Sequence, residues 1–174
     1  MARVSGSKDM PVTPAIRALR AARAEFVGHV YAYVEHGGTR QAAAWLGVDE
    51  HAVIKTLVME AHGHAGAGSR PAPLLVLMHG DREVSTKQLA RVLDVKSVVP
   101  ASEAAVTKAT GYLPGGVSPF GTRTRLPVYM EETILQFPAI YINGGKRGFL
   151  VEIAPAALAQ LLDPVPVAVG IEEH

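Results

Sequence analysis

The sequence contains no cysteine, and it has no large excess of charge of either sign. Without cysteine the chain cannot form a disulfide, a thiolate zinc site or a cysteine nucleophile, and a reducing compartment suits it. Lysine and arginine total 17 against 16 aspartate and glutamate residues, which gives a formal net charge of +1. Proteins that coat nucleic acid or anionic membranes usually carry a large positive surplus, so any polyanion must be bound here by a local basic patch.

The chain also lacks long apolar segments. Its first 15 residues carry charge but no apolar centre like that of a secretory signal. No run of about 18 apolar residues, the length that would suggest a membrane span, occurs anywhere. We therefore expect no membrane segment and a cytoplasmic protein.

The residues that are present give little support to metal or serine chemistry. Of the seven histidines, the nearest to a ligand pair is His62 with His64, and no third ligand stands at a suitable spacing. Ser118 lacks a nucleophile-elbow sequence, and no histidine or acid is positioned by the sequence to activate it. We expect no metal, no organic cofactor and no serine hydrolase.

Length and composition favour a single domain. A chain of 174 residues that is 48% hydrophobic can enclose one sizeable core and is too short for two ordinary domains with a linker. Residues 1–12 have no period that could bury a face, so we expect a flexible N-terminal segment there. One domain should follow over residues 13–163, with a loose C-terminal tail over residues 164–174.

Helix and strand patterns mix irregularly along this domain. Runs of β-branched and aromatic residues predict strands at residues 26–34, 53–61, 74–80, 97–100, 126–130, 139–143 and 149–153. Helical spacing and capping signals predict helices or helical turns at residues 14–26, 40–47, 89–95, 103–110, 132–137 and 155–163. The expected helix ends are capped by Thr13, Thr39, Ser85 and Ser102, and closed by Gly47 and Gly111. This order predicts an α+β domain with a mixed sheet and helices packed on it.

Lys55 lies in the predicted strand "VIKTLVMEA". Strand alternation puts Lys55 on the same face as Leu57 and Met59, so a cation faces apolar neighbours. In one interpretation the side chain sits near the strand end and extends its ammonium to water along its own methylenes. In the other, the ammonium stands at a pocket mouth and meets a phosphate or a carbonyl oxygen.

The loop "PGGVSPFG" concentrates backbone freedom at residues 114–121. Gly115 and Gly116 have no Cβ, so a ligand can approach their amides closely, and Pro119 stiffens the end of the loop. Several fixed amide donors could hold an adenosine, a phosphate or an ester carbonyl oxygen, the last being an oxyanion-hole arrangement. The alternative is a turn that only links a helix to a strand. The loop is not a Walker loop, which would end in Gly-Lys followed by Ser or Thr.

A second glycine pair occurs in "INGGKRGF". Gly144 and Gly145 explain it as a tight hairpin turn, on which Lys146 and Arg147 would be ordinary charged residues. Arg123 and Arg125 add basic groups after the first glycine loop. Together these basic residues could contact an RNA backbone.

Four segments in this order, "VTPAIRAL", "VIKTLV", "TGYLPGGVSPFGTRTRLPVY" and "AIYINGGKRGFLVEI", resemble the YbaK-type aminoacyl-tRNA deacylases. Those proteins are relatives of the editing domain inserted in bacterial prolyl-tRNA synthetases. The resemblance covers residues 13–163, and the glycine loop with its "TGY" preface is more specific than any single glycine pair. It implies a mixed, bifurcated sheet flanked by helices.

The resemblance also implies roles for individual residues. In the family, the lysine of the "KTL" strand helps to hold the aminoacylated 3′ end, a role that falls on Lys55. The loop at residues 115–119 supplies backbone groups around the ester and the terminal adenosine. The expected catalytic groups are therefore Lys55, Gly115 and Gly116. The first-strand tyrosine corresponds best to Tyr31, although Tyr33 lies on the same face. Other expected contacts are Val117, Ser118, Pro119, Phe120, Asn143, Gly144 and Gly145 to substrate, and Arg123, Arg125, Lys146 and Arg147 to tRNA.

The implied function is that of a freestanding trans-editing enzyme that removes a mischarged amino acid from tRNA, with cysteine on tRNA(Pro) as first choice. No protein nucleophile is conspicuous, so positioning and a polarised carbonyl must supply most of the acceleration. Water or the substrate's own thiol would attack the ester, as hydrolase or lyase chemistry. The expected partners are the acceptor end of mischarged tRNA and, as a candidate, prolyl-tRNA synthetase.

Two positions depart from the cysteine-specific members of the family. Asn143 stands where they have serine, and Leu150 stands where they have aspartate. The amino-acid pocket could therefore differ, and alanine or another small residue is the alternative substrate. A hypothesis of another class is a binding or regulatory module that recognises an adenosine-containing ligand or a tRNA end without turnover.

Overall fold

The computed structural model describes residues 3–4, 10–63 and 70–173 of the chain. Its helices are α1 (Pro14–Ala21), α2 (Gly38–Leu46), α3 (Thr86–Leu93), α4 (Glu103–Thr110) and α5 (Pro155–Leu162), with 3-10 turns η1 (Glu50–Ala52) and η2 (Glu132–Gln136). Its strands are β1 (Arg3–Val4), β2 (Val27–Val30), β3 (Val53–His62), β4 (Ala72–His79), β5 (Arg82–Val84), β6 (Ser97–Pro100), β7 (Val128–Glu131), β8 (Ile140–Lys146), β9 (Phe149–Ile153), β10 (Val165–Val167) and β11 (Gly170–Glu172).

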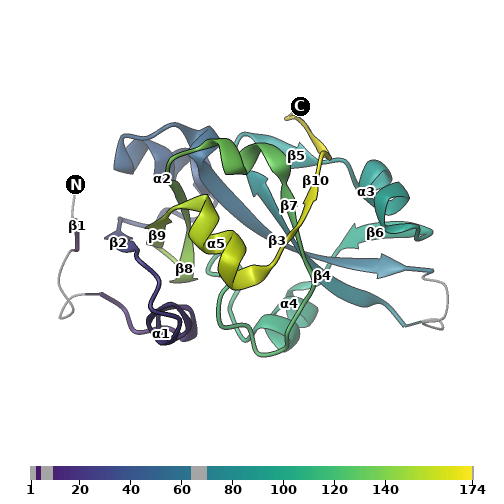
Figure 1. Ribbon diagram of the computed structural model, residues 1–174, viewed down its shortest axis with the longest axis horizontal. Coiled ribbons are helices and arrows are strands. Elements are labelled where there is room, and N and C mark those ends of the chain that lie inside the picture. Colours follow the sequence, from purple (N-terminus) through teal and green to yellow (C-terminus); the bar gives the residue numbers. More distant parts are fainter. Residues whose placement is uncertain (1–2, 5–9, 64–69, 174) are drawn as a thin grey trace.

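Most strands belong to one mixed sheet that crosses the molecule (Figure 1). In the described part of the chain the sheet has nine strands in the order β1-β2-β9-β8-β3-β4-β7-β10, with β6 also paired to β3. The pairs β3–β8, β4–β7 and β7–β10 are parallel, and the other pairs of this sheet are antiparallel. Strands β5 and β11 form a separate two-stranded sheet. The predicted α+β domain with a mixed sheet is confirmed.

Strand β3 is where the sheet divides. On one side β3 pairs with β4 over residues 54–61. On its other side β8 pairs only with Val53 and Ile54, and β6 pairs only with residues 59–62. Among the described residues no strand covers this edge of β3 between those two pairings. The sheet is thus bifurcated, as the family resemblance implied, and residues 55–57 lie in the opening of the fork.

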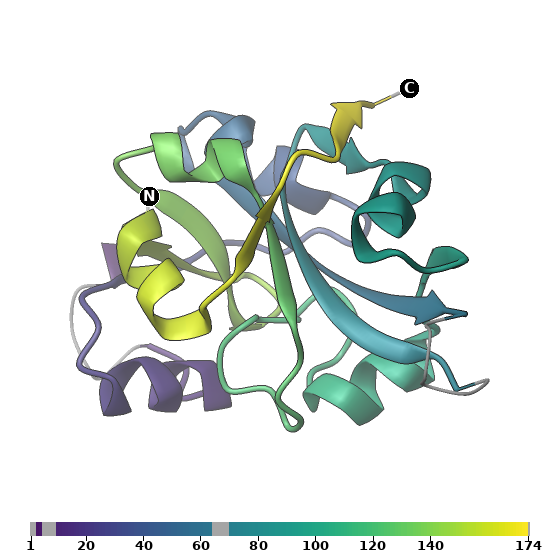
Figure 2. The ribbon, with the colours of Figure 1, turned by 45° about the vertical axis from the view of Figure 1, so that its right-hand side comes forward.

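Helices cover both faces of the sheet (Figure 2). On one face α1 and α5 pack, through Ile16 and Leu158 among others, on a cluster that includes Ile54 of β3. On the other face α3 packs on a cluster that includes Met59, and α2 packs on Val53. Because successive strand residues alternate between faces, Lys55 lies on the α2–α3 face and Thr56 on the α1–α5 face.

Helix boundaries agree with most of the local signals. Thr13, Ser85 and Ser102 each accept a hydrogen bond from the backbone amide three residues ahead, at 3.2–3.3 Å, as N-cap side chains do. Gly47 and Gly111 end their helices with a left-handed backbone. These five predictions are confirmed.

Three local predictions near the N-terminus are wrong. Thr39 does not cap α2, whose N-cap is Gly37; the Thr39 hydroxyl instead lies 3.1 Å from the Gly80 carbonyl oxygen. Helix α1 ends at Ala21, because the chain turns at Arg23 with φ of 56°, so Phe26 lies outside it. The strand expected over residues 26–34 is only β2, which leaves the tyrosine-bearing residues after it in irregular structure.

The expected loose tail over residues 164–174 is also wrong. Strand β10 lies parallel to β7, and β11 pairs with β5. Buried Glu131 fixes the segment between them, because its carboxylate accepts hydrogen bonds from the amides of Val169 at 2.7 Å and Gly170 at 2.5 Å. Most of the N-terminal segment 1–12 lies outside the described residues, although β1 pairs with β2 and Met10 packs against the core.

A buried histidine of β4 connects η1 to η2. His79 is 1% exposed, and its ring stacks on that of His51 with centroids 3.6 Å apart. Its Nδ1 donates to the His51 carbonyl oxygen at 2.6 Å, which leaves Nε2 to accept from the Thr133 hydroxyl at 2.6 Å. Burial lowers the pKa of His79 below its usual 6.5, because the charged imidazolium is poorly solvated there.

This lowered pKa predicts acid destabilisation. The unfolded chain binds a proton at His79 that the folded protein resists, so the stabilising contribution is complete above about pH 6.5 and is lost as the pH falls below it. In urea unfolding between pH 7.5 and pH 5, we expect His79→Asn to lower stability at pH 7.5 and to flatten the pH dependence by up to about 1.4 kcal/mol per pH unit. His36→Asn is the control, because the His36 side chain is 92% exposed. Equal slopes for His79→Asn and the wild type would contradict the prediction.

Candidate functional site

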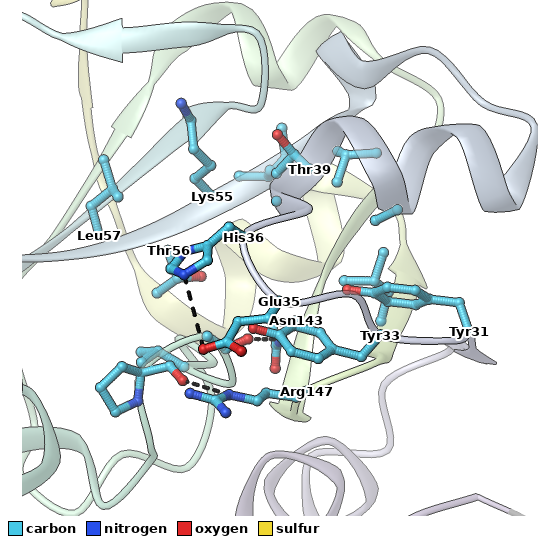
Figure 3. A pocket seen from close by; sticks show the side chains of 18 of the residues that line it. Tyr31, Tyr33, Glu35, His36, Thr39, Lys55, Thr56, Leu57, Asn143 and Arg147 are labelled. Carbon is cyan, nitrogen blue, oxygen red and sulfur yellow. Dashed lines mark hydrogen bonds and ion pairs between the residues drawn. The ribbon is translucent and has the colours of Figure 1, made fainter.

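The fork in the sheet opens into a cavity of about 580 Å³ (Figure 3). Most of its wall comes from three parts of the chain. The first is the segment from Tyr31 to α2, the second is the start of β3 through Leu57, and the third is the glycine loop together with the β8–β9 hairpin. The cavity therefore joins the KTL strand to the glycine loop. The sequence alone does not show that these two segments lie close together.

Lys55 lines the cavity but does not point at the glycine loop. Its ammonium lies 3.2 Å from a carboxylate oxygen of Glu173, and the Lys55 side chain is 23% exposed. Figure 3 shows the ammonium directed away from Asn143 and Arg147. This direction follows from strand alternation, because Lys55 and the glycine loop lie on opposite faces of β3.

Thr56 supplies a polar group that sequence reasoning missed. Its Oγ1 is buried and has no hydrogen-bond partner among the described residues, and the side chain lines the cavity. An unpaired buried hydroxyl costs about 1–3 kcal/mol unless a ligand or water satisfies it. Strand alternation predicts the face of β3 on which Thr56 lies. The burial of its hydroxyl at the fork, however, can be seen only in the three-dimensional structure.

The first half of the glycine loop contributes to the cavity through Gly115 and Val117. Gly115 has φ of 84°, and a Cβ there would lie 3.0 Å from Nε of Arg147, so glycine is required. The Gly116 amide donates to the Leu113 carbonyl oxygen at 2.9 Å and is not available to a substrate. In the part of the chain that the structure describes, the Gly115 and Val117 amides donate no hydrogen bond. They are the loop's candidate oxyanion donors, whereas Gly116 is a packing residue.

The second half of the loop faces the core instead of the cavity. Ser118 is fully buried, and its Oγ accepts a hydrogen bond from the Phe120 amide at 3.2 Å. Phe120 is 2% exposed, and its carbonyl oxygen accepts from the Tyr112 hydroxyl at 2.6 Å. Burial raises the pKa of Tyr112 to about 12, so this donor keeps its proton. Ser118, Pro119 and Phe120 anchor the loop, and none of them lies in the cavity wall.

Asn143 connects the glycine loop to the β8–β9 hairpin. Its Nδ2 lies 3.3 Å from the carbonyl oxygens of both Gly115 and Lys146, and its Oδ1 accepts from the amides of Gly145 at 2.6 Å and Lys146 at 3.2 Å. Only a carboxamide offers donors and an acceptor in one short side chain. Asn143 therefore holds the Gly115 carbonyl against the hairpin, and with it the position of the neighbouring amides.

The second glycine pair is not the hairpin turn that we expected. The turn is formed by Arg147 and Gly148, and Gly144 and Gly145 form a β-bulge before it. A Cβ on Gly144 would collide with the ring of Phe149, and Gly145 has φ of 98°, so both positions require glycine. Neither lines the cavity.

Of the four basic residues expected to contact tRNA, Arg147 is the one that lines the cavity. Its Nε donates to the Pro114 carbonyl oxygen at 3.0 Å, and its guanidinium lies 5.4 Å from the ring centroid of Tyr33. Arg147 thus fixes the outer edge of the glycine loop. Lys146, Arg123 and Arg125 are exposed and lie outside the cavity wall.

Tyr31 and Tyr33 both line the cavity, although they lie beyond the end of β2. The Tyr31 amide still donates to the Gly148 carbonyl oxygen at 2.9 Å, which holds this segment beside the hairpin. Burial, and to a lesser extent the nearby Tyr33, raises the pKa of Tyr31 above its usual value. Glu35, His36 and Glu103 also line the cavity, and no motif in the sequence could have indicated them.

Neither a metal cluster nor a membrane-spanning helix is found among the described residues. Within residues 3–4, 10–63 and 70–173, no three histidine, aspartate or glutamate side chains gather as metal ligands would. His64, half of the histidine pair considered above, lies outside those residues. None of the described helices has the length and apolar character needed to cross a bilayer.

Comparisons with known proteins match the part of this chain that contains most of the residues lining the cavity. Residues 37–161 match the aminoacyl-tRNA editing domain. The chain is 30% identical over 155 residues to the candidate Cys-tRNA(Pro)/Cys-tRNA(Cys) deacylase EbsC of Enterococcus faecalis, which is 88% of this chain and 90% of that protein. It is also 30% identical over 119 residues to a proline–tRNA ligase of Desulfotalea psychrophila. That alignment covers 67% of this chain but 19% of the ligase.

A similar fold occurs in a crystal structure of a candidate trans-editing enzyme for prolyl-tRNA synthetase. The two structures superpose with a TM-score of 0.75 at 24% identity, over 94% of this chain and 100% of that chain. The range that matches the editing domain, residues 37–161, contains Lys55, the glycine loop and Asn143. Strands β10 and β11 lie beyond the end of that range.

The contacts of Asn143 predict that it restrains the glycine loop. Asn143→Asp keeps the oxygen that receives the Gly145 and Lys146 amides but cannot donate to Gly115, so each lost hydrogen bond should cost about 1 kcal/mol of stability. Hydrogen exchange of the Gly116 amide, which donates to the Leu113 carbonyl oxygen within this loop, should accelerate at least about fivefold, the factor that corresponds to about 1 kcal/mol. Gln41→Glu makes the same change of charge and removes the hydrogen bond from Gln41 to the Ala32 carbonyl. If both variants changed loop exchange equally, the restraint would not come from Asn143.

Proposed function

This chain belongs to the aminoacyl-tRNA editing domain family, and we propose that it removes a mischarged amino acid from tRNA, with cysteine on tRNA(Pro) as the first candidate substrate. The observation that carries the proposal is the cavity at the fork of the sheet, which joins Lys55 and Thr56 to the glycine loop. Its volume of about 580 Å³ lies within the range of about 300–1,000 Å³ typical of small-ligand sites. Such a space suits a terminal nucleotide and its aminoacyl ester, with the rest of the tRNA outside.

The proposed chemistry needs no protein nucleophile. The chain has no cysteine, and the Ser118 hydroxyl is buried beneath the loop. The Gly115 and Val117 amides would polarise the ester carbonyl, and Thr56 would donate to the same oxygen or hold a water. Attack by water on the carbonyl carbon releases the amino acid and the ribose hydroxyl. Attack by a cysteine substrate's thiol instead closes a thiolactone and releases the same hydroxyl.

The apolar end of the cavity supports a small acyl side chain. Ala42, Val53 and Leu150 meet there in one packed cluster, and each is less than 5% exposed. Leu150 occupies the position of an aspartate in cysteine-specific relatives, so this end offers no charge to a polar side chain. Cysteine and alanine both suit it, because a pocket of this kind separates residues that differ by one methylene by only about 1–3 kcal/mol.

The proposed grip on tRNA is local and electrostatic. Arg147 at the cavity edge, with exposed Lys146, Arg123 and Arg125, would meet phosphates of the acceptor end. Binding through a few phosphates weakens as salt rises and carries little sequence information, so tRNA identity would be read partly by a partner such as prolyl-tRNA synthetase. We propose the cytoplasm as the location, because tRNA is charged and used there.

The deciding measurement is deacylation of a panel of mischarged tRNAs. We expect the wild type to release cysteine from Cys-tRNA(Pro), or alanine from Ala-tRNA(Pro), faster than buffer, and to spare Pro-tRNA(Pro). Lys55→Ala should lower kcat/KM by about 10- to 100-fold, mainly through a higher KM, because a hydrogen bond to a charged group contributes about 1.5–3 kcal/mol. Lys87→Ala is the matched control, because Lys87 is exposed on α3 away from the cavity.

If every ester in the panel survives the wild type as long as it survives buffer, the enzymatic proposal fails. The binding-module hypothesis then takes its place, and Lys55→Ala should weaken binding of the tRNA end instead of its hydrolysis. The panel also identifies the amino acid, since only esters that fit the apolar end should be cleaved.

A further inference from the structure

The ion pair of Lys55 with Glu173 links the candidate site to a part of the chain outside the editing-domain match, which ends at residue 161. The pair joins side chains 118 positions apart, and the Glu173 side chain is 48% exposed. Among the described residues, Glu173 is the acid that contacts the Lys55 ammonium. Figure 3 shows this ammonium turned away from Asn143 and Arg147.

The chain just before Glu173 is held firmly. The amides of Val169 and Gly170 donate to the Glu131 carboxylate, and the Ser85 amide donates to the Val169 carbonyl oxygen at 2.8 Å. Val169 is fully buried, and β11 pairs with β5 up to Glu172. A Cβ on Gly170 would collide with the Glu131 carboxylate, so glycine lets the segment pass this close.

Because this segment is anchored, the Glu173 carboxylate is held close to the Lys55 ammonium. Glu173 comes directly after Glu172, the last paired residue of β11, so its carboxylate stays near the ammonium at a high effective concentration. Because the Glu173 side chain is partly exposed, water can solvate its carboxylate when the ion pair with Lys55 breaks. The carboxylate is therefore held close enough to occupy Lys55 and is free enough to be displaced.

We propose that Glu173 is an internal competitor for the oxygen of the substrate, phosphate or carbonyl, that Lys55 binds. The proposal deepens the proposed function and rests on it for the role of Lys55. In the resting protein the carboxylate occupies the ammonium, and a ligand that uses Lys55 must first displace it. The apparent dissociation constant for such a ligand equals the intrinsic constant divided by the fraction of molecules in which Lys55 is free.

The expected size of this effect is modest and depends on salt. Ion pairs between partly exposed side chains typically shift an equilibrium about twofold to fivefold, and added salt screens them. Release of Lys55 should therefore lower the KM for an aminoacyl-tRNA by about that factor at low salt, with kcat unchanged. At about 1 M salt, where the Debye length falls to about 3 Å, the difference should disappear.

The first experiment measures the ion pair itself and requires no deacylase activity. Glu173→Gln removes the charge of the competitor, and Glu172→Gln makes the same change one residue earlier. Acetylation of Lys55 by limiting acetic anhydride, followed by mass spectrometry, should be about twofold to fivefold faster in Glu173→Gln than in the wild type. Glu172→Gln should match the wild type. Equal Lys55 labelling in Glu173→Gln and the wild type overturns the proposal.

The second experiment asks whether the ion pair matters for the substrate. With the mischarged tRNA that the panel identifies, Glu173→Gln should lower KM at 50 mM salt, and Glu172→Gln should not. An unchanged KM together with faster Lys55 labelling would show that the pair forms without competing, and would also overturn the proposal. If no ester is cleaved at all, the proposed function fails. The labelling result then still decides whether Glu173 occupies Lys55, and binding of the tRNA end decides the competition.

Discussion

The structure of the site depends on a stretch of one edge of β3 that no strand of the described residues covers. β4 pairs along β3, whereas β8 leaves it after Ile54 and β6 joins it only at Met59. Backbone groups in such a gap must be met by water or a ligand, since unpaired groups are costly inside a protein. At this gap both faces of the strand open into a common space. Lys55 on one face and Thr56 on the other thereby border the same cavity.

The glycine loop divides two tasks among its residues. Its buried half supplies rigidity, because the Ser118 hydroxyl and the Tyr112 hydroxyl satisfy backbone groups that water cannot reach. Its open half supplies amides, and Gly116 allows the loop to lie against the backbone of Lys146 and Arg147. Preorganised donors of this kind lose little free energy to reorganisation when charge develops on an oxygen. Residues that look like one motif in the sequence thus act on opposite sides of the loop.

How far the sequence predicts this structure depends on how far apart the interacting residues lie. Thr13 and Ser102 could be recognised as caps, because a cap bonds an amide three residues away. The bulge at Gly144 could not be recognised, because it depends on the ring of Phe149, which packs against Gly144 across the hairpin. The order of the C-terminal segment depends on Glu131, which precedes Val169 by 38 positions. Lys55 and the glycine loop could be linked only through family resemblance, since their shared cavity requires the fork.

The position of the strand between Lys55 and the glycine loop has a chemical consequence for the proposed reaction. Amide dipoles can stabilise a developing oxyanion without a neighbouring cation, so the ammonium on the other face is available to hold a different group of the substrate. A substrate that crosses the open edge of β3 contacts both faces at once. Binding energy gained at the remote face can then orient the ester at the amides. A short ester that reaches only one face lacks that energy, so the fork itself favours a long substrate such as a charged tRNA end.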